Sequence, residues 1–250
     1  MAVIQYREIK PIPQLADFVE SFWMLVNPSD EGKDVMVIPD SRIDISFSYS
    51  RDKPYHVTLN GLESEPIQSV ILPNTVIFAI SFKLLAIEYL LDVKVSSLIN
   101  TAQILPVDFW KIVPEDLNNF DSFCKKISDH LVLLVKPSID KRKVKLFKLI
   151  YSSEGALTVK QLSEQVNWTS RQINRYFNTQ FGIPLKSYCN ILRFKTSFRQ
   201  IKRGRLFPEK NFADQAHFIK NVKKFSGVAP GELAKNKNDR FIQLSVLPGK

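Results

Sequence analysis

Two stretches near the C-terminal end of the sequence repeat each other at a fixed offset of 45 residues. The first is TSRQINRYFNTQFGI, residues 169–183, and the second is DQAHFIKNVKKFSGV, residues 214–228. Thr169 and Asp214 begin the two copies with side chains that cap helices. Gly182 and Gly227 end them at the left-handed position where a helix stops. Apolar side chains recur between these ends at helical spacing. Each copy therefore predicts one capped, amphipathic helix.

The segment before the first copy predicts a second helix joined to it by a tight corner. In TVKQLSEQV, residues 158–166, Thr158 and Gln161 have the spacing of a capping box. Asn167 follows, and Asn tolerates the left-handed backbone that a tight corner needs. Thr169 and Gln172 then form a second capping box. A helix, a short corner and a capped helix indicate a helix-turn-helix motif, in which the first helix braces against phosphates and the second enters the major groove.

The second helix of this motif has the chemistry to read bases. Its core positions are Ile173, Phe177 and Phe181, which leaves a polar set facing outward: Ser170, Arg171, Asn174, Arg175 and Asn178. Arg pairs with guanine and Asn with adenine in the major groove. For each of these residues taken singly, a solvated helix surface is the alternative.

A long connection separates the two copies. PLKSYCNILRFKTSFRQIKRG, residues 184–204, predicts roughly 20 helical residues that span about 30 Å. Successive major grooves on one side of DNA lie roughly 34 Å apart. We therefore expect one chain to read two successive grooves as a monomer.

The charge of the chain is concentrated in the part that carries the repeat. Residues 1–150 hold 17 Lys and Arg against 19 Asp and Glu, whereas residues 151–250 hold 18 against 6, a net charge of +12. Such asymmetry indicates a polyanionic partner, most often nucleic acid. A solvated basic surface without a partner is the alternative.

The N-terminal part alternates strand and turn signals. WMLV, VMVI and ISFSY are short runs of β-formers separated by NPSDEG and PDSR, which predicts an antiparallel sheet or small barrel. FKLLAIEYLLDV has helical spacing, and residues 114–135 predict a long helix that links the halves. The expected fold is an α+β domain over residues 1–136, followed by an all-α domain with two helix-turn-helix motifs over residues 141–235.

Several classes of protein are disfavoured by the composition. The start MAVIQYREIKPIPQL lacks the pattern of a signal peptide, and the most apolar stretch, residues 76–93, contains three charged side chains. Cys124 and Cys189 have no second Cys or His at ligand spacing, so we expect buried thiols in a reduced, cytoplasmic setting. His217 has no ligand partner at helical spacing either. We expect no cofactor, no metal and no membrane.

The motifs together resemble the AraC family of transcription regulators. The resemblance covers residues 144–233 and rests on LSEQV, on T-x-R-x-I-x-R-x-F at 169–177, on FGIPLKSYCNILR at 181–193 and on NFADQAHFIKNVKKFSGVAP at 211–230. It implies double-stranded DNA and, by family analogy, RNA polymerase as partners. The recognition positions that it implies are Ser170, Arg171, Asn174 and Arg175 in the first motif, and Gln215, Ala216, His217, Ile219 and Lys220 in the second. Our candidate DNA-binding residues are Ser170, Arg171, Gln172, Asn174, Arg175, Gln215, His217 and Lys220.

The second motif departs from the family pattern in two ways. Gly204 is followed only by RLFPEK before Asn211, where the family has a full brace helix, and Pro208 fits only a first turn or a loop. Ala216 and Ile219 also offer no hydrogen bond to a base. We therefore predict that the second motif positions the protein more than it specifies sequence.

The N-terminal half resembles an uncharacterised domain found in front of AraC-type modules, through DFVESFW, VIPDSRIDI and ISFKLLAIEYLL. Ser41 stands where that domain usually has Gly. By analogy, two roles are open for it: binding of a small-molecule effector, or formation of a homodimer. Asp40 and Asp44 read as an Asp-rich turn before a strand, with a paired acid and base as the alternative. Phe22 and Trp23 read as core aromatics, with a ligand pocket as the alternative.

The sequence thus predicts a cytoplasmic, sequence-specific transcription regulator that is not an enzyme. A fused DNA-repair alkyl acceptor, known beside such modules, needs a metal-held Cys cluster that two distant cysteines do not form. The remaining alternative is a protein-binding module whose basic face meets an acidic partner and no longer reads DNA.

Overall fold

The computed structural model describes residues 4–208 and 212–247, and it divides into two compact units. The first unit contains the chain up to Lys33 together with residues 42–61 and 70–139. The second contains residues 34–41 and 62–69 together with the chain from Asp140 onward. The second unit is therefore built from the C-terminal part of the chain and from two short segments of the N-terminal part.

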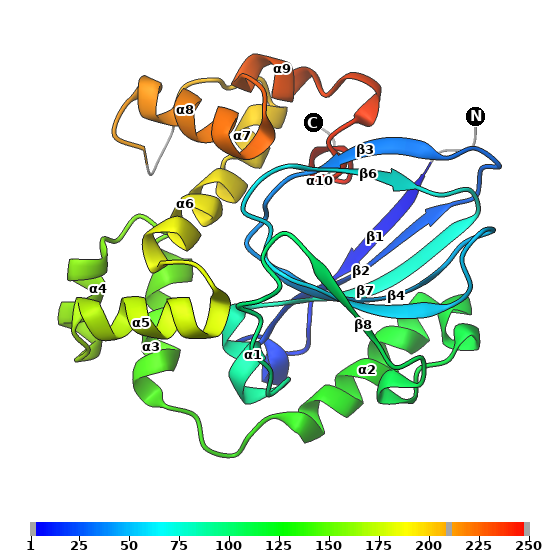
Figure 1. The fold of residues 1–250 in the computed structure, drawn as a ribbon, viewed down its shortest axis with the longest axis horizontal. Coiled ribbons are helices and arrows are strands. Elements are labelled where there is room, and N and C mark those ends of the chain that lie inside the picture. Colours follow the sequence, from blue (N-terminus) through cyan, green and yellow to red (C-terminus); the bar gives the residue numbers. More distant parts are fainter. Residues whose placement is uncertain (1–3, 209–211, 248–250) are drawn as a thin grey trace. The chain divides into compact units, whose positions relative to one another are not determined.

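The first unit is built on a six-stranded sheet with the strand order β1-β2-β7-β4-β5-β8 (Figure 1). The paired strands are antiparallel, which confirms the predicted antiparallel sheet. Their bounds are β1 Gln5–Ile9, β2 Val19–Asn27, β4 Ile43–Tyr49, β5 His56–Asn60, β7 Thr75–Phe82 and β8 Ala102–Leu105.

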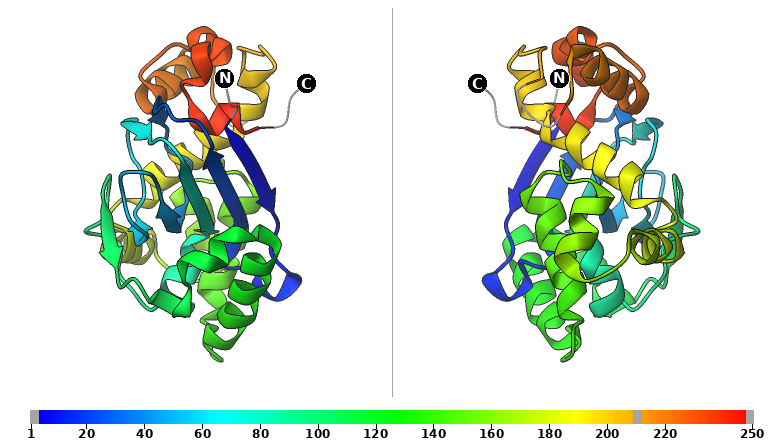
Figure 2. Two further views of the ribbon diagram at one scale, coloured as in Figure 1. Left: turned by 90° about the vertical axis from the view of Figure 1, so that its right-hand side faces the viewer. Right: turned by 90° about the vertical axis from the view of Figure 1, so that its left-hand side faces the viewer.

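One face of this sheet is apolar and packs against helix α2, Phe120–Leu134. The Phe123 ring lies edge-on to Phe47 and Phe78, with ring centroids 5.6 and 5.4 Å apart. Aromatic pairs in this geometry add to the stability that burial of the rings already gives. The views in Figure 2 show α2 against this side of the sheet. Shorter elements complete the unit: α1 Leu84–Tyr89 and the 3-10 turns Pro13–Leu15, Phe109–Lys111 and Pro114–Asn118.

The long helix predicted over residues 114–135 is shorter than expected. Residues Pro114–Asn118 form a separate 3-10 turn, and α2 begins only after Asn119. Asn119 has extended backbone, and its side-chain oxygen accepts a hydrogen bond from the Ser122 N–H at 2.9 Å. This cap stops the preceding turn from continuing into the helix. The helix also lies wholly within the first unit and does not link the halves.

The second unit is helical over its C-terminal part, as predicted. Its helices are α3 Lys141–Ser152, α4 Val159–Val166, α5 Ser170–Phe181, α6 Leu185–Thr196, α7 Phe198–Lys202, α8 Gln215–Ser226, α9 Pro230–Lys235 and α10 Ile242–Ser245, with a 3-10 turn at Lys237–Asp239. In Figure 1 α6, in yellow, leads from α5 to the group formed by α7, α8 and α9. None of the described helices is long and apolar enough to cross a membrane.

Two segments from the N-terminal part of the chain complete the second unit. They carry most of strands β3, Lys33–Val37, and β6, Ile67–Ile71, which pair with each other. The Gln243 side chain binds the backbone of Ile38 twice, accepting from its N–H at 3.1 Å and donating to its carbonyl at 2.9 Å. Met36 forms a parallel bridge with Phe241, which is 2% exposed. We call these two contacts, Gln243 with Ile38 and Phe241 with Met36, the tail clasp.

The connection between the two repeated helices bends. Residues 184–204 were expected to form one helix, but α6 ends at Thr196 and α7 begins at Phe198. Between them the buried Ser197 hydroxyl donates to the Phe194 carbonyl at 2.6 Å. A serine that bonds back to the preceding turn weakens the helical ladder and bends the helix. The straight connector of about 30 Å is therefore wrong, since the twelve residues of α6 span about 18 Å.

Candidate nucleic-acid interface

The first motif is a tight helix-turn-helix formed by α4 and α5. Three residues, 167–169, separate the two helices, and Asn167 has the left-handed backbone (φ 54°) expected of the corner. Both predicted capping boxes form. In the second, the N–H of Gln172 donates to the Thr169 hydroxyl at 3.2 Å, while the Gln172 side-chain oxygen accepts from the Thr169 N–H at 2.8 Å. Gly182 ends α5 with φ 75°.

An aromatic cluster supports the corner from inside the second unit. Trp168 lies beside Tyr176, with ring centroids 5.6 Å apart. Two cations from the first turn of α3 cover these rings: the Arg142 guanidinium lies 5.2 Å from Trp168, and the Lys143 ammonium 4.7 Å from Tyr176. Such cation–π contacts stabilise by about 0.5–1 kcal/mol at exposed sites. The start of α3 and the start of α5 are therefore held together.

Asp140 fixes the position of Arg142. Its carboxylate caps α3 by accepting from the Arg142 N–H at 2.8 Å, and it also accepts from the guanidinium at 2.7 Å. The side-chain hydrogen bond from Arg142 lowers the pKa of the Asp140 carboxyl. The guanidinium is thus held over the Trp168 ring from one side, close to the point where the chain enters the second unit.

The outer face of α5 presents the predicted reading residues. Arg171, Asn174, Arg175 and Asn178 follow the i, i+3, i+4, i+7 spacing of one helical face. Arg171 and Arg175 are exposed, and neither side chain makes a hydrogen bond or ion pair with any residue that the structure describes. Asn174 is half-buried and Asn178 is exposed. Two unpaired guanidinium groups and two amides on one face can donate to guanine and pair with adenine.

Two other candidates of the first motif have local roles in the structure. The Gln172 side chain closes the capping box with Thr169. The Ser170 hydroxyl lies 3.3 Å from that of Ser163 on α4 and joins the two helices of the motif. As DNA contacts these two residues stay predictions.

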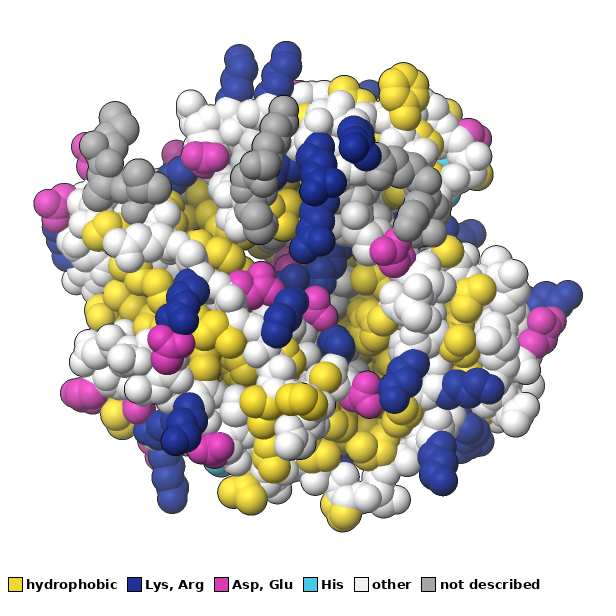
Figure 3. Space-filling model, turned by 180° about the vertical axis from the view of Figure 1, so that it is seen from behind, with side chains coloured by type: hydrophobic (Ala, Val, Ile, Leu, Met, Phe, Trp, Pro, Cys, Tyr) yellow, Lys and Arg dark blue, Asp and Glu magenta, His cyan; other side chains and the backbone are white. Residues whose placement is uncertain are grey.

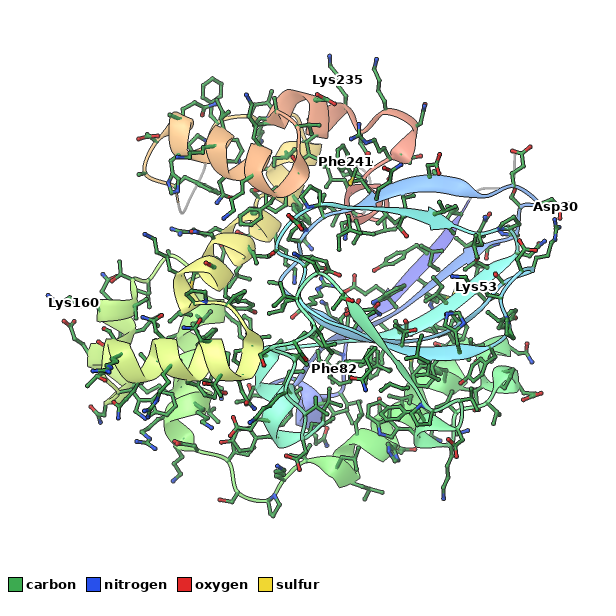
Figure 4. All side chains as sticks on the ribbon, viewed as in Figure 1. Asp30, Lys53, Phe82, Lys160, Lys235 and Phe241 are labelled. Carbon is green, nitrogen blue, oxygen red and sulfur yellow. The ribbon has the colours of Figure 1, made fainter. Side chains whose placement is uncertain are left out.

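The brace helix α4 adds a cation that the sequence analysis did not single out. Lys160 is exposed, and Figure 4 shows its side chain extending away from α4 into solvent. In a helix-turn-helix the first helix lies over the phosphate backbone. The signal in the sequence was Lys at the second position of a capped helix directly before the reading helix.

The second reading helix, α8, uses its predicted contact residues for its own structure. Asp214 caps it by accepting from the His217 N–H at 2.7 Å. The His217 ring accepts from the Ala213 N–H at 3.4 Å and lies 5.6 Å from the Phe212 ring. The half-buried Gln215 donates to the Leu206 carbonyl at 2.8 Å. Gln215 and His217 are therefore engaged locally, and as DNA contacts they stay predictions.

The outer face of α8 offers cations in place of base-reading groups. At the 45-residue offset, Ala216, Ile219, Lys220 and Lys223 stand where α5 has Arg171, Asn174, Arg175 and Asn178. Lys220 and Lys223 are exposed. A lysine acts on phosphate as a point charge and lacks the bidentate fork of arginine. This face is therefore suited to the DNA backbone. Along the top of Figure 3, where α7 to α9 lie, Lys and Arg side chains stand out in dark blue.

The second motif also lacks a tight corner. Twelve residues, 203–214, separate α7 from α8, against three in the first motif. No helix occurs between Lys202 and Gln215 in the described residues 203–208 and 212–214. Over those residues the truncated brace is confirmed, while 209–211, which include Asn211, lie outside the described part of the chain.

The other face of the sheet in the first unit carries polar side chains beside apolar ones such as Leu25 and Ile77. Strand register places Trp23, Ala79, Ser46 and Thr58 in one row across β2, β7, β4 and β5. The Trp23 indole donates to the Ser81 hydroxyl at 3.0 Å, the Asn60 amide donates to the Ser46 hydroxyl at 3.2 Å, and the Ser48 hydroxyl lies 3.2 Å from the His56 ring. We call this the polar sheet face. It combines an indole with hydroxyl, amide and imidazole groups, several of them half-buried.

The structure bears on the remaining single-residue interpretations. Phe22 is 1% exposed, as expected for a core aromatic, whereas Trp23 is half-buried on the polar sheet face. Cys124 and Cys189 are both buried free thiols, and burial raises the pKa of each to about 12. Within the described residues, no three His, Cys, Asp or Glu side chains are grouped so as to hold a metal ion.

Comparisons with known proteins follow this division of the chain. Residues 7–103 match the model of a family described as "Domain of unknown function (DUF6597)". The matched residues precede the helical region that carries the two capped helices α5 and α8. The sequence resemblance to AraC-type regulators leads us to expect a domain in front of two helix-turn-helix motifs.

Among solved structures the chain is similar to ToxT from Vibrio cholerae. An apo form from strain SCE256 is 10% identical, covers 90% of this chain and 98% of its own, and gives a TM-score of 0.45. ToxT from strain O395 is 13% identical; the match covers 85% of this chain and 96% of that one, with a TM-score of 0.43. Unsaturated fatty acid bound ToxT is 11% identical; the match covers 93% of this chain and 94% of that one, with a TM-score of 0.41. No curated protein matches the chain. At these identities nothing of the function or ligands of ToxT is carried over to this chain.

Proposed function

We propose that this protein is a sequence-specific DNA-binding regulator of transcription of the AraC type, and that it reads bases through α5. The observation that carries the proposal is the outer face of that helix, where Arg171 and Arg175 stand exposed and unpaired beside Asn174 and Asn178. The net charge of +12 over residues 151–250 adds the electrostatic attraction that DNA binding requires. We propose no catalytic role.

In this proposal the two motifs have different roles on DNA. α5 inserts into a major groove and discriminates between bases, whereas α8 holds the backbone through Lys220 and Lys223 and fixes the register of the protein on the duplex. Contacts to phosphate position a protein without reading sequence. Reading of two successive grooves by one chain is the finer form of this proposal, and it depends on where the bent connection at Ser197 places α8.

The test is binding of the full-length protein to its own upstream DNA and to a shuffled duplex of equal composition, at about 150 mM salt. Specific regulators prefer their site by at least about 10³. Arg175→Ala is expected to reduce the preference by about 10- to 100-fold, because a bidentate base contact contributes roughly 1–3 kcal/mol of discrimination. Lys237→Ala, which removes an exposed cation outside both reading helices, is the matched control. Equal weak binding to both duplexes by the unchanged protein would overturn the proposal and favour the alternative of a basic protein-binding module.

We also propose the polar sheet face as the place where a small-molecule effector binds in the first unit. An indole can cover the flat side of a ligand while the neighbouring hydroxyl and amide groups fix its orientation. The chemistry favours a small, hydrogen-bonding ligand. Homodimer formation and contact with RNA polymerase stay predictions drawn from the family.

A thermal-shift panel of polar metabolites tests this site. A true ligand raises the melting temperature of the unchanged protein and of the control variant Ser187→Ala, which lies in the second unit. The same ligand is expected to lose its effect on Trp23→Leu and on Asn60→Ala. A ligand that stabilises all four proteins alike binds elsewhere and counts against the polar sheet face.

A further inference from the structure

The loop between α7 and α8 occupies the place in the chain where the first motif has its brace helix. Gly204, with φ 73° and no atom within 4 Å of an added Cβ, turns the chain away from the end of α7 into solvent. Leu206 of this loop meets Gln215, the residue that follows Asp214, the N-cap of the second reading helix. In a helix-turn-helix the N-terminal end of the reading helix is the end that enters DNA. The loop therefore lies at the DNA side of the second motif.

Two side chains anchor this loop. Gln200 on α7 donates to the Phe207 carbonyl at 3.0 Å, and Gln215, the first residue of α8, donates to the Leu206 carbonyl at 2.8 Å. The adjacent carbonyls of residues 206 and 207 are thus held from both neighbouring helices. The backbone at Phe207 is consequently held close to the start of α8.

Phe207 itself points into solvent. Its side chain is 74% exposed, while the aromatic residues Phe194, Phe218 and Phe225 of the neighbouring helices are at most 1% exposed. An exposed phenyl ring on an anchored loop costs free energy of hydration that burial against a partner recovers. The ring is therefore available to a partner and serves no purpose in the core of the unit.

The surroundings of Phe207 are cationic. The stretch RQIKRGRLFP, residues 199–208, contains four Lys and Arg and no Asp or Glu. Arg199, Arg203 and Arg205 are exposed, whereas Lys202 donates to the carbonyl of Leu244 at 2.9 Å. An aromatic ring between arginines is suited to nucleic acid, because the cations meet phosphates while the ring packs against sugars or wedges at a base step.

We propose that the loop Arg203–Phe207 replaces the missing brace as a DNA contact of the second motif. Arg203 and Arg205 bind phosphates beside the groove that α8 enters, and Phe207 inserts against the adjacent minor-groove edge and bends the duplex there. The inference rests on the proposed DNA-binding function. It reads no sequence, so the contact acts on any duplex.

The experiment measures affinity and bending by the full-length protein on its upstream duplex and on the shuffled one. Affinity is followed by fluorescence anisotropy over a range of salt concentrations, and bending by energy transfer between dyes at the two duplex ends. Phe207→Ala is expected to weaken binding to both duplexes by about tenfold, since it removes a buried apolar contact. It is also expected to straighten the DNA and to leave the salt dependence unchanged. Phe207→Leu, which keeps an apolar wedge, is expected to retain most of the affinity.

Two further variants make the result specific. Leu133→Ala removes an exposed apolar side chain from α2 in the first unit, 84% exposed, and is expected to change neither affinity nor bending. Arg203→Ala is expected to lower the slope of log affinity against log salt by about 0.9, the amount for one phosphate contact.

The outcomes separate this inference from the proposed function. If the unchanged protein binds both duplexes equally, base reading by α5 fails, yet a tenfold loss in Phe207→Ala still supports the loop contact. If the protein prefers its own site but Phe207→Ala binds and bends DNA as the unchanged chain does, the loop contact is overturned and the function stands. Loss of a protein partner by Phe207→Ala with unaltered DNA binding would likewise overturn it, in favour of a protein-binding ring.

Discussion

The two helix-turn-helix motifs of this chain share their helix ends and differ in what lies between and outside them. Both reading helices start at a side-chain cap and end at a left-handed glycine. The first is held by a three-residue corner and an aromatic cluster, whereas twelve residues separate the second from α7, and none of the described ones is helical. The first presents two unpaired arginines, the second lysines and short apolar side chains. A helix can thus keep its termini, which its fold requires, while its outer face changes its chemistry.

The largest expected difference between the motifs is in base discrimination. Arg175→Ala is expected to reduce the preference for the cognate duplex by roughly 1–3 kcal/mol. Lys220→Ala, at the matching position of α8, is expected to weaken binding to cognate and shuffled duplexes alike and to reduce the salt slope by about 0.9. Anisotropy titrations of both variants on both duplexes, repeated at several salt concentrations, measure the duplex preference and the salt slope. An equal loss of discrimination from the two substitutions would break the comparison.

Substitution of the N-terminal helix caps of α5 and α8 is expected to have a smaller effect, on the free energy of unfolding. Thr169→Ala is expected to lower the free energy of unfolding by about 1 kcal/mol, because it removes a cap and its capping box. Asp214→Ala is expected to cost a similar amount through the loss of the bond to the His217 N–H. Thr169→Ser and Asp214→Asn, which keep a capping oxygen, serve as controls in urea unfolding. A negligible effect at Asp214 alone would show that α8 is held by packing and not by its cap.

The cation–π contacts predict a still smaller difference. Arg142→Ala removes the guanidinium over Trp168, and Lys224→Ala removes the ammonium 5.1 Å from Phe225 in the second motif. Each contact is expected to contribute about 0.5–1 kcal/mol. Hydrogen exchange resolves the difference, because only Arg142→Ala is expected to speed exchange of amides at the start of α5. Faster exchange at the start of α5 in Lys224→Ala as well would mean that the two motifs unfold together.

The smallest expected effect is the reactivity of the native thiol on α6. Burial raises the pKa of Cys189 to about 12, so below that pH the folded protein holds almost no thiolate to react. We expect no labelling of Cys189 by a thiol reagent at pH 8 in the native protein and rapid labelling in urea. A thiol placed on the exposed loop by Phe207→Cys is expected to react at once under native conditions. Prompt native labelling of Cys189 would show that α6 opens far more readily than its packing indicates.

Local signals in the sequence predicted what depends on local geometry. Thr158, Thr169 and Asp214 cap their helices as expected, and Asn167 takes the left-handed corner, because each of these roles involves residues within four positions. The antiparallel sheet followed from alternation of β-formers. The same capping box that identified α5 also explains why Gln172 has a structural role, which the choice of candidate DNA contacts overlooked.

Features that depend on distant parts of the chain were not predictable. The break at Ser197 depends on burial of its hydroxyl by the rest of the unit, which leaves the Phe194 carbonyl three positions earlier as its partner. The engagement of Gln215 depends on the path of a loop whose carbonyl it meets nine positions away. In the sequence RLFPEK, Phe207 is an aromatic residue next to a proline and near charged residues, which does not indicate whether it is buried. Only the structure shows that its side chain is exposed.

The tail clasp has a consequence for the order in which the chain acquires its structure. Gln243 binds Ile38, a residue 205 positions earlier in the chain. During synthesis residues 34–41 leave the ribosome long before their partners at 240–243, and the second unit cannot be completed until those partners have been made. A fragment that begins at Asp140 would expose Phe241 and leave the Tyr188 hydroxyl without the Ser41 carbonyl that it meets at 3.2 Å. Helices α5 and α8 therefore belong to a unit that is complete only after residues 240–243 have joined the much earlier segment 34–41.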